Sequence, residues 1–335
     1  MFKNITILGA GSWGMAIAKI LQSNSANVTM WEFNKEDCDI IRTQRCHPKK
    51  LSMITLDASI EITNDLHASL ENAELVVLAI PSQSLRKVLQ NVKNIDFSKV
   101  SFVNLAKGIE IGSLKRMSEV IHEELQVPYS QIATLSGPSH AEEVATDIPT
   151  AIVAASESSE LTRSIQKIFS TATLRVYESD DLIGVELGGS LKNIIAIGAG
   201  ITAGLKMGDN TMGALLTRGL AEIKRLGIAM DAKSDTFAGL SGVGDLVTTC
   251  MSQHSRNRYV GEHIGRGEKL DDIIASMAMV AEGVQTTKSG FELAKKYNVE
   301  MPITFEVYEV LFNNKQPDIA IKQLMSRDLK TEVWQ

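Results

Sequence analysis

Cysteine is scarce in this chain. The three cysteines, Cys38, Cys46 and Cys250, form no C-x-x-C pair. A disulfide framework and a zinc ribbon are therefore disfavoured, and a reducing, cytoplasmic location is expected. The sequence also lacks an H-x-x-x-H pair, a carboxylate cluster with metal-ligand spacing and a G-x-S-x-G nucleophile elbow. We therefore expect neither a metal ion nor covalent catalysis.

Basic residues are not in excess, and no apolar run is long enough to span a bilayer. The 34 lysines and arginines stand against 40 acidic residues, so nucleic acid is not an expected partner. The longest uncharged apolar segment, 193–205, lies between Lys192 and Lys206 and falls short of the ~20 residues that a membrane helix needs. We expect a buried helix there. No basic region and cleavage site mark a signal peptide.

The first fourteen residues carry the most specific pattern in the chain. A short apolar strand over 3–8 runs into the sequence GAGSWG at 9–14, and an apolar helical pattern follows. Gly9 permits a tight turn, Gly11 lets the backbone approach a phosphate, and Gly14 lets the helix pack closely on the strand. The helix N-terminus adds free N–H groups and a partial positive charge. This order predicts a dinucleotide-binding site.

Apolar strands and helical stretches alternate as far as residue 180. Continuous apolar strands imply a mostly parallel sheet that helices cover on both faces, and ligands bind beyond the carboxyl ends of such strands. We therefore predict an α/β fold: a Rossmann-type, doubly wound domain over 1–180 and an all-α substrate domain over 181–335. The further strands are expected at 27–32, 74–80, 100–105, 132–135, 151–155 and 174–177.

Glycine is concentrated in the first long helical segment of the second domain. The segment 182–205 contains six glycines, each of which costs ~1 kcal/mol of helix propensity relative to alanine. So many glycines in one buried helix predict close packing against a partner helix or a ligand.

Three charged residues are candidates for ligand binding or chemistry. Glu32 ends the second strand about 20 residues beyond the glycine loop, where an acid can bind the adenosine ribose; the alternative is a solvated strand-end charge. Lys107 follows an apolar strand and precedes Gly108, which places it at the cleft unless it is a surface lysine. Lys192 interrupts an apolar helix, so burial would depress its pKa and make it a proton acceptor. Alternatively, its stem is buried and its head reaches water.

Two further segments carry polar groups among glycine and apolar residues. Asp245, in GVGDLVTTC at 242–250, could pair with a cleft lysine or simply cap the next helix. Arg256 could hold a phosphate with two parallel hydrogen bonds, and Asn257 could add a neutral donor. Arginine pairs on helices are more often solvated, so this second pattern is weak alone.

Taken together, these segments resemble the bacterial NAD(P)-dependent glycerol-3-phosphate dehydrogenases over nearly the full length. Several motifs in the right order are far more specific than one glycine loop. The resemblance rests on GAGSWG at 9–14, AKG at 106–108, SGPSHAEEV at 136–144, GVELGGSLKNIIAIGAG at 184–200, RGLAEI at 218–223, GVGDLVTTC at 242–250, SRNR at 255–258, AEGVQTTK at 281–288 and EMPIT at 300–304.

The resemblance implies specific roles for matching positions. Lys192 would be the proton acceptor, Asp245 would position it, and Thr249 would orient the reacting hydroxyl. The residues that would contact glycerol phosphate are Lys107, Gly137, Ser139, Lys192, Asp245, Ser255, Arg256 and Asn257. Those that would face the cofactor, besides the three loop glycines and Glu32, are Ser12, Trp13, Lys107, Ala141, Arg256, Val280 and Glu282.

The chain departs from the family where the cofactor's 2′-phosphate would bind. After the second-strand tryptophan the family commonly has His or Arg, whereas Phe33 and Asn34 follow Glu32 here. We therefore expect NADH to serve at least as well as NADPH, unless Arg42, Arg45 or Lys49 supplies the missing charge.

The resemblance implies that the main cellular direction is reduction of dihydroxyacetone phosphate to the phospholipid precursor, and we expect a homodimer. Two alternatives remain: another two-domain dehydrogenase acting on a hydroxy acid or sugar-acid phosphate, and a non-catalytic NAD-binding protein.

Overall fold

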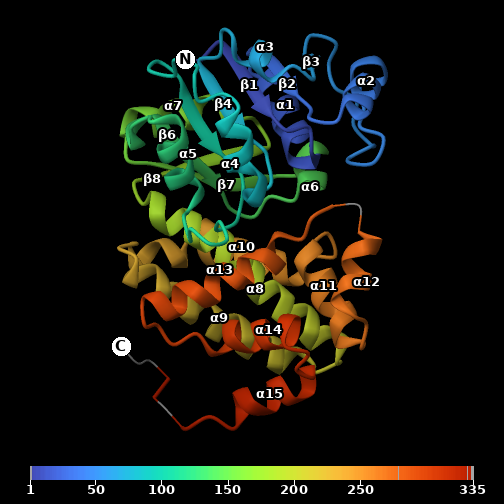
Figure 1. Cartoon of the computed structure of the whole chain (residues 1–335), viewed down its shortest axis with the longest axis vertical. Helices are drawn as coiled ribbons and strands as arrows, with labels where there is room; N and C mark the ends of the chain where they lie inside the picture. The colour runs from blue at the N-terminus through green and yellow to red at the C-terminus, as the bar shows by residue number, and fades with distance from the viewer. Residues whose placement is uncertain (1, 278, 330, 333–335) are drawn as a thin grey trace.

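The protein consists of an α/β domain followed by a helical domain. A computed structural model describes residues 2–277, 279–329 and 331–332. In Figure 1 the sheet and its helices form the upper body and a helical body lies below it. The predicted α/β domain followed by an all-α domain is confirmed. Residue 1 of the predicted first domain and residues 278, 330 and 333–335 of the predicted second domain lie outside the described residues.

All eight strands of the first domain belong to one sheet in the order β3-β2-β1-β4-β5-β6-β7-β8. Every neighbouring pair is parallel except β6 and β7, which are antiparallel, so a mostly parallel sheet is confirmed. The strands are β1 (Asn4–Leu8), β2 (Asn27–Trp31), β3 (Glu61–Thr63), β4 (Leu75–Leu78), β5 (Ser101–Asn104), β6 (Ile132–Ser136), β7 (Thr150–Ser156) and β8 (Leu174–Ser179).

The central strands are buried on both faces. Leu75 and Val77 of β4 belong to one apolar cluster, whereas Val76 and Leu78 belong to the cluster on the opposite face. This explains why the strand is read as one uninterrupted apolar run. The helices of this domain are α1 (Ser12–Ser23), α2 (Lys35–Gln44), α3 (Leu66–Leu70), α4 (Ser82–Gln90), α5 (Met117–Leu125), α6 (Ala141–Ala145) and α7 (Ser159–Phe169), with a 3₁₀ turn η1 at Tyr129–Gln131.

The edge strand β3 is the one strand that the sequence did not predict. It has only three residues, and its sequence, Glu61-Ile62-Thr63, buries only Ile62. A strand this short at a sheet edge shows neither an alternating pattern nor a continuous apolar run. It is recognisable only from its pairing with β2.

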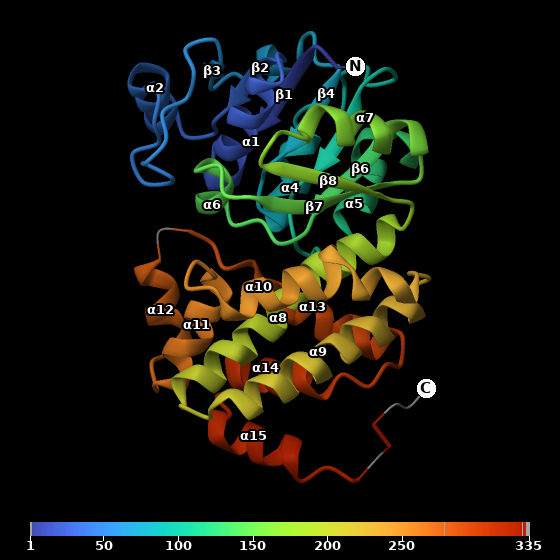
Figure 2. The ribbon, with the colours of Figure 1, turned by 180° about the vertical axis from the view of Figure 1, so that it is seen from behind.

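The second domain is built around α8 (Leu182–Gly204), which runs diagonally through the helical body in Figure 2. This helix is long and apolar enough to cross a membrane by length and composition, but 89% of its apolar window is buried inside the protein. The other elements are α9 (Asp209–Ala229), η2 (Ser234–Ala238), a π-helical turn η3 (Leu240–Gly244), α10 (Asp245–Met251), α11 (Arg256–Gly265), α12 (Leu270–Ser276), α13 (Glu282–Lys296), α14 (Pro302–Phe312) and α15 (Pro317–Met325).

The glycines of α8 let its backbone lie against that of α11. A Cβ atom on Gly200 would stand 2.0 Å from the carbonyl oxygen of Arg258. From the other side, a Cβ atom on Gly261 would stand 1.9 Å from the carbonyl oxygen of Ile197. The predicted close approach is therefore to a partner helix at these positions, and it leaves no room for a side chain on either one.

This contact predicts that Gly261→Ala is destabilising. The added methyl group meets backbone rather than a flexible side chain, so the helices must separate, which should cost about 1–3 kcal/mol or more. Gly213 on α9 is the matched control, because a Cβ there has nothing within 4 Å. Gly213→Ala should be neutral or stabilising by about 0.4–1 kcal/mol. Urea unfolding measures both, and equal stability of the two variants would contradict the packing account.

Candidate active site

Two buried side chains, Lys192 and Asp245, and the partly buried Lys107 form the centre of the candidate site. The Asp245 carboxylate accepts hydrogen bonds from two lysine ammonium groups: Lys107 reaches Oδ2 at 2.8 Å, and Lys192 is bonded to Oδ1. Lys192 also donates to the Thr249 hydroxyl at 2.6 Å. Asp245 is 1% exposed and Lys192 5% exposed, so Lys192 is not a snorkelling lysine.

Each of these groups comes from a different element. Lys107 follows β5, at the carboxyl edge of the sheet. Lys192 lies in the middle of α8. Asp245 is the first residue of α10, directly after the π-helical turn. That helix is preceded by Gly244 and has no side-chain cap, so the carboxylate faces the lysines instead of capping its own helix.

The electrostatics of the cluster favour a charged aspartate and a titratable lysine. Burial lowers the pKa of Lys192 to about 8, since desolvation and the charge of Lys107 outweigh the attraction of Asp245. Burial would raise the pKa of Asp245, but the two ammonium groups prevail and hold it below its usual value. Two cations and one anion leave the cluster with a net positive charge. Such a site attracts an anionic ligand and contains a lysine that can exchange a proton near neutral pH.

The loop after β6 completes the wall around Lys107. The ammonium group of Lys107 donates to the carbonyl of Gly137 at 2.9 Å and lies 3.5 Å from the Ser139 hydroxyl. Gly137 has a φ of +137°, which disfavours a side chain, and a Cβ atom there would meet Ile152. Ala141 is buried at the start of the short helix α6. The structure therefore brings Gly137, Ser139 and Lys107 together.

The glycine loop has the geometry that a dinucleotide phosphate requires. Gly9 has a φ of +109°, and a Cβ on Gly14 would stand 2.1 Å from the carbonyl oxygen of Gly9. A Cβ on Gly11 would meet nothing within 4 Å, so the backbone there borders open space. Helix α1 begins at Ser12 with no side-chain cap. Its first N–H groups are thus available to an anion, and the residues present fit a nucleotide cofactor.

A segment of the helical domain lies close to this glycine loop. The Ser12 hydroxyl is 3.7 Å from the sulfur of Met279. The next residue, Val280, accepts a hydrogen bond from the exposed Arg256 guanidinium at 2.9 Å through its carbonyl. Trp13 is partly buried against the apolar cluster of the first domain. These contacts bring Ser12, Val280 and Arg256 to one region between the domains.

Glu282 joins the two domains through backbone contacts. Its carboxylate accepts from the N–H of Ser82, at the start of α4, at 2.7 Å and from the N–H of Lys107 at 3.2 Å. Because it stands at the first position of α13, it fastens that helix to the edge of the sheet where Lys107 begins its loop.

Two predicted substrate contacts are already engaged within the protein. The Ser255 hydroxyl caps α11 by accepting from the N–H of Arg258. The Asn257 amide donates to Asn193 and accepts from the N–H of Gly283, both at 2.9 Å. The Asn193 amide in turn donates to the carbonyl of Lys107 at 2.9 Å. Sequence reasoning missed Asn193, although its place next to Lys192 on a buried helix was a usable signal.

Glu32 lies apart from the lysine cluster, just past the end of β2. It is 8% exposed, and its carboxylate accepts from the N–H of Asn34 at 2.9 Å. The neighbouring Phe33 side chain is 79% exposed.

The three basic residues considered as substitutes for the family's cation are engaged elsewhere. Arg42 pairs with Asp39, Lys49 lies 3.4 Å from Asp37, and Arg45 donates to the backbone carbonyl of Ile60 at 2.7 Å.

Comparison with known proteins matches both domains to one family. The family model described as NAD-dependent glycerol-3-phosphate dehydrogenase N-terminus matches residues 4–162, and the corresponding C-terminus model matches residues 181–322. Curated relatives named glycerol-3-phosphate dehydrogenase [NAD(P)+] include one from Fusobacterium nucleatum, 46% identical, covering 98% of both chains. One from Salinibacter ruber is 49% identical and covers 99% of this chain and 97% of its own.

A solved structure supports the same assignment. The crystal structure of glycerol-3-phosphate dehydrogenase from Coxiella burnetii is 37% identical, with a TM-score of 0.93, and covers 97% of this chain and 99% of its own. A ketopantoate reductase from Ralstonia eutropha, at 14% identity and a TM-score of 0.63, shares the fold alone. Because the two family models match residues 4–162 and 181–322, the chain belongs to the NAD-dependent glycerol-3-phosphate dehydrogenase family.

Proposed function

We propose that the protein interconverts sn-glycerol 3-phosphate and dihydroxyacetone phosphate with a nicotinamide cofactor. The observation that carries this proposal is the Lys107–Asp245–Lys192 cluster at the carboxyl edge of the sheet, in which Asp245 and Lys192 are buried. It lies at the junction of the two domains, which we divide at residue 180, and the relatives that cover nearly the whole chain bear the name of this activity. Neither alternative dehydrogenase chemistry nor a non-catalytic role is favoured by these matches.

Lys192 is the proposed proton carrier. In oxidation its neutral amine accepts the proton from the C2 hydroxyl of glycerol 3-phosphate, and in reduction its ammonium returns a proton to the C2 oxygen. A pKa of about 8 allows both forms near neutral pH. Asp245 holds the amine in place, and Thr249, 2.6 Å from Lys192 Nζ, orients the hydroxyl.

The phosphate of the substrate is the proposed partner of the cationic groups around the cluster. Arg256 is exposed at the start of α11 and presents a planar fork suited to two phosphate oxygens. Lys107, Gly137, Ser139, Ser255 and Asn257 complete the proposed substrate contacts. Holding the non-reacting phosphate orients C2 for reaction and so contributes to the rate.

The proposed nicotinamide cofactor would supply the hydride acceptor or donor. The residues that would hold it are Gly9, Gly11, Ser12, Trp13, Gly14, Glu32, Lys107, Ala141, Arg256, Val280 and Glu282. The cradle at Gly11 and the uncapped start of α1 suit its phosphates. The proposed cellular direction is reduction, which supplies a phospholipid precursor, by a cytoplasmic homodimer.

We propose that NADH serves at least as well as NADPH. Glu32 places a negative charge at the end of β2, and Phe33 and Asn34 bring no positive one. Arg42 and Lys49 face carboxylates, and Arg45 is bonded to backbone carbonyls. A 2′-phosphate near Glu32 would therefore meet a like charge, with the exposed Lys35 as the cation close in sequence.

Replacement of Lys192 tests the proposed chemistry. Lys192→Ala should reduce kcat for dihydroxyacetone phosphate reduction by about 10²–10⁴-fold, the usual effect of losing a general acid. Lys192→Arg should restore little, because a guanidinium keeps the charge but does not give up its proton near neutral pH. NADH binding, followed by fluorescence, should persist in both variants. Lys224→Ala, on the exposed face of α9, serves as the control, and near-normal kcat in Lys192→Ala would remove Lys192 from the chemistry.

The cofactor proposal is tested by comparing NADH and NADPH. The wild-type kcat/KM should be at least as high with NADH, and Glu32→Ser combined with Phe33→Arg should shift the preference toward NADPH. The physical reason is that the double substitution removes a like charge and adds a cation for the 2′-phosphate. A wild-type kcat/KM clearly higher with NADPH would mean that another basic residue reaches the ribose.

A further inference from the structure

The loop that carries Lys107 is folded into a compact unit, here named the 107–116 loop. It contains no helix, but Ile109 and Arg116 form an antiparallel bridge. The N–H of Glu110 donates to the carbonyl of Lys115 at 3.0 Å, and the N–H of Leu114 donates back to the carbonyl of Glu110 at 3.1 Å. Glu110 thus sits at the point where the loop closes on itself, three residues after Lys107.

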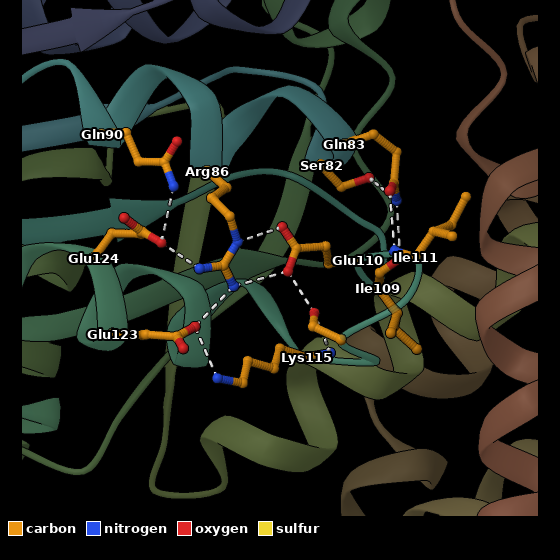
Figure 3. A network of polar contacts seen from close by, with 11 residues as sticks. Ser82, Gln83, Arg86, Gln90, Ile109, Glu110, Ile111, Lys115, Glu123 and Glu124 are labelled. Atoms are coloured by element: carbon orange, nitrogen blue, oxygen red, sulfur yellow. Dashed lines mark hydrogen bonds and ion pairs between the residues drawn. The ribbon is translucent and has the colours of Figure 1, made fainter.

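Two side chains of α4 fasten this loop to the first domain (Figure 3). Gln83 donates to the carbonyl of Ile109 at 2.9 Å and accepts from the N–H of Ile111 at 3.0 Å, so it pairs with the backbone much as a neighbouring strand would. One turn later, Arg86 forms two parallel hydrogen bonds with Glu110, from Nε and Nη2, both 2.8 Å long. A bidentate guanidinium–carboxylate pair fixes orientation as well as distance.

The pair differs from an ordinary surface ion pair. Only 24% of the Arg86 side chain and 12% of the Glu110 side chain are exposed. Arg86 also contacts Glu123 at 2.8 Å and Glu124, both on α5, as Figure 3 shows. The hydrogen bonds to Glu110 are the main reason why the pKa of Arg86 is raised. Arg86 in turn holds the pKa of Glu110 below its usual value. One guanidinium thereby joins α4, α5 and the 107–116 loop.

The same loop is held from the helical domain. The Ser289 hydroxyl of α13 donates to the carbonyl of Ile109 at 3.0 Å. The N–H of Lys107 is bonded to Glu282 and its carbonyl to Asn193. At the far end, Arg116 donates to the buried Glu186 of α8 at 2.7 Å. The loop is therefore fastened to both domains along its length. The direction in which the Lys107 side chain points depends on both sets of contacts.

We propose that Arg86 and Glu110 are positioning residues that keep the 107–116 loop in the register that places the Lys107 ammonium on Asp245. Neither side chain is bonded to the lysine cluster, so each acts through the loop backbone. This inference rests on the proposed function, in which Lys107 and Lys192 share Asp245. When the pair is lost, Lys107 shifts away from the carboxylate while Lys192 stays bonded to it.

The shift has a consequence that general loosening of the fold would not produce. The charge of Lys107 lowers the pKa of Lys192, and Asp245 raises it. If Lys107 moves away, the like charge weakens and Asp245 serves Lys192 alone. Both changes raise the pKa of Lys192. The alkaline limb of kcat/KM for dihydroxyacetone phosphate reduction, where Lys192 loses its proton, therefore moves to higher pH.

The test uses the full-length protein with dihydroxyacetone phosphate and NADH. Arg86→Gln and Glu110→Gln should lower kcat/KM by about tenfold or more, since misplacement by about 1 Å can cost about 10²-fold. In both variants the alkaline limb of kcat/KM should move to higher pH while NADH affinity is unchanged. Arg86→Lys should fall between wild type and Arg86→Gln, because it keeps the charge and loses the second hydrogen bond. The control is Glu124→Gln, which removes a carboxylate from Arg86 without touching the loop.

Each outcome decides the proposal. A lower kcat/KM with the shifted limb, absent in Glu124→Gln, supports it. Unchanged kinetics in folded Arg86→Gln or Glu110→Gln overturns it, and so does a lower melting temperature with an unmoved limb, which marks a purely structural pair. If Arg86→Gln does not fold, Arg86→Lys and Glu110→Gln carry the same comparison. A wild-type protein that fails to reduce dihydroxyacetone phosphate would instead refute the proposed function itself.

Discussion

A single buried carboxylate, Asp245, is the constraint on which the two domains and the proposed chemistry both depend. It neutralises one of two ammonium groups that come from different domains, Lys107 from the sheet edge and Lys192 from α8. Without this carboxylate the two ammonium groups would face each other with no anion between them, and the pKa of the buried Lys192 would fall further. The same arrangement leaves a net positive charge where a phosphorylated substrate would bind, and it leaves Lys192 with a pKa of about 8.

The packing of the helical domain explains how Lys192 can be buried at all. Glycines on α8 and α11 bring the two backbones together, and α8 is buried along almost its whole length. Burial on that scale lowers the pKa of Lys192, because desolvation penalises the ammonium form. The close helix packing that glycine permits thus contributes to the burial that lowers the pKa of Lys192.

Much of the fold could be predicted from the sequence because its signals are local. Apolar runs mark β1 and β4, and the spacing of Gly9, Gly11 and Gly14 predicts the phosphate turn. The short edge strand β3 could not be predicted, since three residues carry no periodicity. At the candidate site, Lys192 and Asp245 stood out as charges among apolar residues. No sequence pattern marks Arg86 or Glu110, because only the tertiary structure brings the two side chains together. Likewise, the engagement of Asn257 with Asn193 and Gly283 depends on three separate helices.

The pH dependence of glycerol 3-phosphate oxidation tests the central claim most directly. If Lys192 accepts the proton, kcat/KM with NAD should rise with pH through a limb centred near pH 8, where the neutral amine forms. Asp245→Asn should lower the rate and move this limb to lower pH, because removing the anion leaves burial and Lys107 to depress the pKa of Lys192 further. A limb that stays in place, or moves to higher pH, in active Asp245→Asn would contradict the account of the cluster.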